Sequence, residues 1–119
     1  MPIHVGTILS GSSNGQLIAV IATTSPGTTL HTVSSATTGV IEDVWMDAYS
    51  QATTDRILTL EICGTATTFR TEHLIPAQSG PQRVMAGVRF TSATGLVIKG
   101  FATATGGLLV GGAVNRATP

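Results

Sequence analysis

One pentapeptide of the chain has the spacing of a hydrolase nucleophile. Residues 11–15, Gly-Ser-Ser-Asn-Gly, match the pattern Gly-x-Ser-x-Gly with Ser13 at its centre. In hydrolases this serine lies on a sharp turn between a strand and a helix. The residues that follow, 17–21, are apolar and partly β-branched, so they predict a strand where the motif requires a helix. We therefore interpret residues 11–15 as a turn before a strand, and not as a catalytic site.

The histidines and the single cysteine are not spaced as a metal or thiol site. His4, His31 and His73 are too far apart in the sequence for a local metal motif. Cys63 ends an apolar run and has no neighbouring histidine or cation, whereas a catalytic thiolate needs such a neighbour. We expect Cys63 to be a buried strand residue and the histidines to be individually hydrogen-bonded.

The acidic residues give two weak candidates for chemistry. Glu42, Asp43 and Asp47 cluster, but they lack the pattern of a calcium loop, and we expect a solvated strand entry there. Glu61 and Glu72 could serve as a glycosidase pair, although nothing in the sequence favours them over other acids. The sequence therefore predicts a protein that is not an enzyme, with no catalytic residue, no metal site and no cofactor.

Charged residues are scarce in this chain. Six acidic and six basic residues make 10% of its 119 residues, and the formal net charge is zero. Soluble domains usually carry about a quarter of their residues as charges. The basic residues are scattered singly, which disfavours nucleic-acid binding. A weakly charged surface repels neighbours poorly, so this one favours contact with another protein.

A long apolar stretch near the C-terminus does not predict a membrane span. Residues 95–114 carry only one charge, at Lys99, but they include six glycines and alternate in polarity. A spanning helix needs about 20 predominantly apolar residues. We interpret the stretch as two strands joined near Gly106 and Gly107, and we expect no membrane partner.

The recurring turn signals set the expected fold class. Clusters of Gly, Pro, Ser, Asn and Asp separate short runs rich in Val, Ile, Leu and Thr. This pattern predicts an all-β, single-domain antiparallel β-sandwich or jelly-roll-like barrel of about eight strands. The expected strands are residues 17–23, 28–34, 44–49, 58–63, 69–75, 82–91, 96–102 and 108–114.

Polarity alternates most clearly in residues 44–49. Val44, Met46 and Ala48 would share one face, and Trp45, Asp47 and Tyr49 the other. We expect the connection 50–56 to join this strand to the next as an antiparallel hairpin. Core packing is the expected role of the aromatic residues, although Trp45 and Tyr49 are also the best candidates for a sugar-binding platform.

Several segments resemble small virion proteins of tailed bacteriophages, of the capsid decoration or cement type. The segments are residues 43–49, 55–61 and 74–80, together with the Gly/Ala/Val-rich residues 107–116, and the overall likeness covers roughly residues 28–116. The resemblance implies a small β domain on the capsid surface, made in the host cytoplasm. It also implies a major capsid or other virion protein as partner, a homotrimer, and no catalytic residues.

The N-terminal residues are the expected partner contact. Residues 1–15 predict an N-terminal arm or a first strand, ahead of a sandwich domain at 16–119. The segment is apolar yet precedes the first clear strand. The candidate contact residues are Pro2, Ile3, His4, Val5, Ile8 and Leu9.

The sequence is also compatible with a second function, that of a carbohydrate-binding module. A tail fibre or spike module that recognises a host glycan would use exposed aromatic residues as a platform. The residues to examine for that function are Trp45 and Tyr49.

Overall fold

The computed structural model describes residues 3–24, 26–33, 40–63, 68–91 and 96–118. These residues form nine strands in two antiparallel sheets, which confirms the expected all-β sandwich. The strands are β1 (Ile3–Ile8), β2 (Ile18–Ala19), β3 (Thr28–Thr32), β4 (Ile41–Ser50), β5 (Arg56–Cys63), β6 (Thr68–Ile75), β7 (Gln82–Thr91), β8 (Val97–Ala102) and β9 (Leu108–Thr118).

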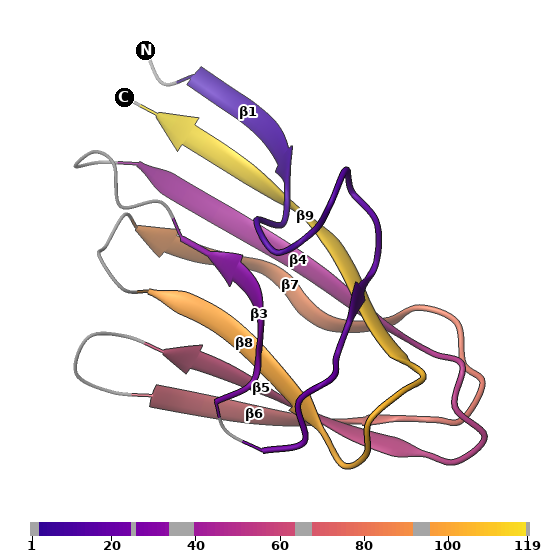
Figure 1. The fold of residues 1–119 in the computed structure, drawn as a ribbon. Helices are drawn as coiled ribbons and strands as arrows, with labels where there is room; N and C mark the ends of the chain where they lie inside the picture. Colours follow the sequence, from indigo (N-terminus) through magenta and orange to yellow (C-terminus); the bar gives the residue numbers. More distant parts are fainter. Residues whose placement is uncertain (1–2, 25, 34–39, 64–67, 92–95, 119) are drawn as a thin grey trace.

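The two sheets are built from strands that are distant in the sequence. One sheet has the order β1-β9-β4-β7, with β2 also pairing with β9, and the other has the order β3-β8-β5-β6. Figure 1 shows β1 beside β9, so that the start of β1 lies opposite the end of β9. Because the chain repeatedly crosses between the sheets, the sandwich has the connectivity of a jelly roll.

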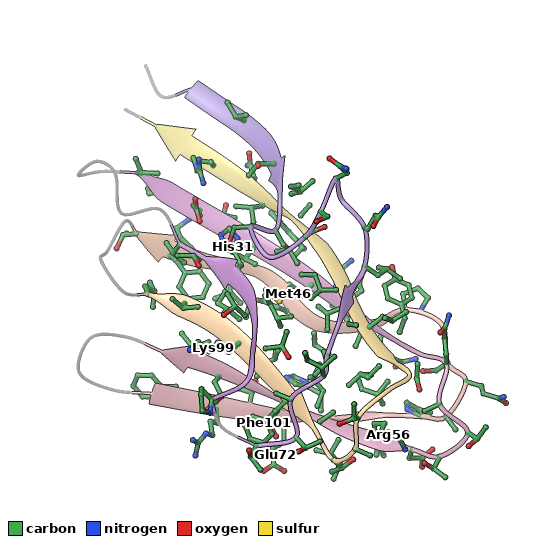
Figure 2. All side chains as sticks on the ribbon, in the orientation of Figure 1. His31, Met46, Arg56, Glu72, Lys99 and Phe101 are labelled. Carbon is green, nitrogen blue, oxygen red and sulfur yellow. The ribbon has the colours of Figure 1, made fainter. Side chains whose placement is uncertain are left out.

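The core lies between the sheets and follows the predicted alternation of β4. The side chains of β4 at even positions, from Glu42 to Ser50, are buried, and those at odd positions are half-buried. Met46 lies between the two layers (Figure 2), together with Leu58 and Leu60 of β5. A strand with one face toward the core requires this period of two.

The expected hairpin between residues 44–49 and 58–63 is wrong. β4 pairs with β7 and β9, whereas β5 pairs with β6 and β8 in the other sheet. The connection 51–55 therefore crosses from one sheet to the other. The alternation of a strand specifies its buried face, but it does not identify its hydrogen-bonding neighbour.

The structure places residues 3–8 within the sandwich. β1 pairs with β9 in unbroken register from Ile3↔Thr118 to Ile8↔Ala113. Leu9, directly after it, is 1% exposed and belongs to the core. The sequence allowed either an N-terminal arm or a first strand, and residues 3–8 form a first strand.

Candidate interaction surface

The pentapeptide at residues 11–15 is a turn, as expected. The Ser12 amide donates to the Leu9 carbonyl, the Gln16 amide donates to the Ser13 carbonyl, and Asn14 has a positive φ of 55°. Strand β2, and not a helix, follows. The turn therefore lacks the strand–helix setting of a hydrolase nucleophile.

A buried polar network joins the two sheets. Glu42 of β4 is 0% exposed, and its Oε1 lies 2.8 Å from Nε2 of His31 on β3. Its Oε2 accepts a hydrogen bond of 2.7 Å from Nε of Arg116 on β9. The Ser10 amide donates to Nδ1 of His31, so the neutral ring carries its proton on Nε2 and donates it to Glu42.

The environment of Glu42 keeps its carboxylate ionised. Burial alone would raise the pKa of Glu42, but the hydrogen bonds from His31 and Arg116, together with the charge of Arg116, outweigh burial. The pKa is therefore lowered from 4.5. The expected solvated strand entry is wrong for Glu42, because this residue shares the inward face of β4 with Val44 and Met46.

A second carboxylate is buried on the outer face of the other sheet. Glu61 of β5 is 1% exposed; it accepts a hydrogen bond from the Gly27 amide at 2.9 Å and another from Arg70 Nε at 3.1 Å. Glu72 of β6 is exposed and lies opposite Thr59. These contacts hold Glu61 to a backbone amide and an arginine, as a structural anion would be held.

The other two acids of the cluster point away from the core. Asp43 is paired with Arg89 at 2.8 Å, and Asp47 with Arg83 at 2.6 Å, both between β4 and β7. The hydrogen bond and charge of Asp43 raise the pKa of Arg89. Within the described residues, no group of three His, Cys, Asp or Glu side chains could hold a metal ion.

Trp45 lies on the outer face of the β1-β9-β4-β7 sheet, between the two aspartate–arginine pairs. Its expected core position is wrong, because it alternates with the buried Val44 and Met46. Gly87 of β7 has a φ of +63°, and a Cβ there would lie 3.1 Å from Cζ2 of Trp45. The ring therefore occupies space that the absent side chain leaves open.

Apolar side chains extend from Trp45 to the β1 edge. Ala113 lies between Trp45 on β4 and Ile8 on β1 in the register of the sheet. Leu17 packs into the space left at Gly111, close to Tyr49. We call this surface the Trp45 face; it consists of Ile8, Leu17, Trp45, Tyr49 and Ala113.

The Trp45 face has the composition of a contact surface. Ile8 and Leu17 are each 44% exposed, and Ala113 is exposed. Asp43–Arg89 and Asp47–Arg83 flank the ring on the β7 side. An apolar centre beside charged residues is the usual anatomy of a protein interface. The sequence showed the faces of β4, but the approach of Ile8 depends on the β1–β9 register.

The predicted contact residues of the N-terminus separate in the structure. Ile8 lies on the Trp45 face, and Val5 is exposed on the same strand. Leu9 is buried in the core, so we remove it from the candidate contacts. Pro2 lies outside the described residues, and only the backbone of Ile3 and His4 is described.

Cys63 ends β5, as expected for a strand residue, and only its backbone is described.

Comparison of the chain with protein-family models, with curated proteins and with solved structures finds no match. Within the described residues, no helix has the length and apolar character needed to cross a membrane.

Proposed function

We propose that this chain is a structural virion protein that decorates the head of a tailed bacteriophage. It binds coat subunits on the capsid surface and stabilises the shell by bridging them. It acts by binding and without catalysis. Its partner is the major capsid protein or another virion protein, and it reaches the particle from the host cytoplasm.

The observation that carries the proposal is the Trp45 face. This face combines exposed apolar side chains with the small, exposed Ala113 of β9. Small residues let another backbone approach the sheet closely, and the adjacent apolar side chains gain from removal of water. The charges beside Trp45 are already neutralised in pairs, so contact with a coat subunit leaves no isolated charge behind.

The fold class adds general support. Double-sheet jelly rolls occur in viral capsid domains, in lectins and in cupins. Because one fold serves several functions, the argument depends on the surface and not on the fold. Only 10% of the residues of the chain are charged, and this scarcity of charge agrees with a permanent component of a protein assembly.

A matched pair of isoleucines tests the docking face. Ile8 is 44% exposed on the outer face of one sheet, and Ile57 is 39% exposed on the outer face of the other. We expect Ile8→Glu to reduce the occupancy of the protein on heads by about tenfold or more, because it puts a charge into an apolar contact.

The control, Ile57→Glu, should bind heads like the unmodified protein. Both variants are checked by circular dichroism, and binding is measured by cosedimentation with heads that lack the protein. Equal binding of the two variants, or a loss with Ile57→Glu alone, would exclude the Trp45 face as the docking surface.

The half-exposed ring of Trp45 also supports the second candidate, a host-glycan recognition module of a tail fibre or spike. Trp45 is the only tryptophan, so intrinsic fluorescence reports directly on this face. A glycan platform predicts saturable quenching of Trp45 by a saccharide, and it predicts that Trp45→Ala abolishes binding of the same saccharide measured by calorimetry. The decoration role predicts that no saccharide tested changes the fluorescence of Trp45.

A further inference from the structure

The four edges of the sandwich differ in how far they are protected from pairing with another chain. The edge formed by β1 and β2 breaks after Ile8. β3 shifts register between Thr29 and His31, and β7 shifts twice against β4. Such irregularities prevent a second strand from pairing along an edge.

β6 has none of these features. It pairs with β5 over all eight residues, from Cys63↔Thr68 to Arg56↔Ile75, without a register shift. Its other side has no strand partner among the described residues. Phe69 is 66% exposed and Leu74 64%, on opposite faces of the strand. In Figure 1, β6 lies at the opposite end of the molecule from β1.

The charges of β6 bear on which strand could pair with it. Arg70 and Glu72 lie on the same outer face, because they are two residues apart in a strand. Arg70 is ion-paired to the buried Glu61, whereas Glu72 has no ion-pair partner among the described residues. Figure 2 shows Glu72 at the β6 end of the molecule.

We propose that β6 pairs with β6 of a second copy of this chain, antiparallel and about a two-fold axis at Thr71. Arg70 of each copy then lies opposite Glu72 of the other, and Phe69 lies opposite His73. The two four-stranded sheets join into one continuous sheet through β6. This interface is isologous, since the same residues are used by both copies.

The neighbouring registers are disfavoured by charge. In a symmetric antiparallel pair, opposite residues must share a face, so the two-fold axis passes through a pair of identical residues. The nearest alternative registers therefore place the axis one residue before or after Thr71. A centre at Arg70 places two arginines opposite each other, and a centre at Glu72 places two glutamates together. Only the centre at Thr71 puts unlike charges opposite each other at both positions.

The inward face of β6 is compatible with the same register. Burial lowers the pKa of His73, so its ring is neutral at pH 7 and stacks against Phe69 of the other copy without a charge. His73 Nε2 lies 3.0 Å from Thr71 Oγ1 of its own chain, which fixes the ring beside the axis. Leu58 of β5 lies directly opposite His73, and Thr71 of β6 is its hydrogen-bond partner; both are uncharged.

Sedimentation equilibrium of the full chain tests this interface independently of any role on a virion. The unmodified protein should have twice the mass of the 12.1 kDa chain. We expect Glu72→Arg to raise the dimer dissociation constant by about ten- to a hundred-fold, because two like-charge pairs replace two attractive ones. Thr71→Lys, which places two lysines at the axis, should do the same.

The matched control is the double variant Thr23→Arg/Thr53→Arg, at two exposed positions that lie outside the described strands. It changes the net charge by the same amount as Glu72→Arg and should remain a dimer. Circular dichroism verifies that each variant is folded. A monomer at all concentrations would overturn the proposal. So would the trimer that the virion resemblance implies, or a dimer that neither β6 variant weakens.

Discussion

Deletion of residues 2–9 is expected to unfold the domain. The deletion removes all six residue pairs between β1 and β9 and exposes the end of the sheet. It also removes Leu9, which is 1% exposed. Loss of a buried leucine side chain alone costs about 2–5 kcal/mol, against a total stability of about 5–15 kcal/mol for a typical domain. Thermal unfolding followed by circular dichroism measures the effect.

A control keeps the backbone of the segment and changes only its exposed side chains. The double variant Val5→Ser/Ile8→Ser retains the β1–β9 pairing, and we expect its unfolding free energy to fall by about 1 kcal/mol or less. If the deleted protein instead unfolds cooperatively at the same temperature as the intact chain, residues 2–9 are an arm and not a structural strand.

Replacement of Glu42 by glutamine is expected to lower the unfolding free energy by about 1–3 kcal/mol at pH 7. The change removes the charge that pairs with Arg116 and places an amide NH₂ where both oxygens accept hydrogen bonds. Because Arg116 is 38% exposed, water partly solvates its guanidinium, so the cost arises mainly at the buried Nε2–H of His31, which loses its charged acceptor. Urea unfolding measures the difference.

Asp47→Asn provides the matched control on the same strand. Asp47 is paired with Arg83 near the surface, where such pairs contribute about 0–1 kcal/mol. We therefore expect a small effect from this change. Equal effects at the two positions would show that the buried network does not stabilise the sandwich more than a surface pair does.

The effect of Glu42→Gln should depend on pH. The pKa of Glu42 is lowered in the folded protein, so its contribution is complete above the unfolded value of 4.5. As the pH falls below 4.5, the unfolded state takes up a proton first and this stability is lost. The difference between the two proteins should therefore shrink on acidification.

Local sequence patterns predicted the strands better than their partners. Residues 82–91 form β7 as expected, and the alternation of 44–49 correctly separated the buried face of β4 from the outer face. The hairpin through 50–56 was wrong because both neighbours of β4, β7 and β9, lie far along the chain. Pairing at that distance depends on the packing of the whole core.

The same limit applies to the candidate surface. The alternation of β4 already placed Glu42 with Val44 and Met46, and this signal could have identified it as buried. Nothing local could have placed His31 or Arg116 beside it. The approach of Ile8 to Trp45 likewise depends on the register of β9, which contacts both strands.

Cryo-electron microscopy of the phage particle tests the central proposal most directly. The decoration role predicts density for this fold at regular positions over the head, with the Trp45 face toward the coat subunits. Density confined to the tail tip, or regular copies on the head that turn the Trp45 face to solvent, would contradict it.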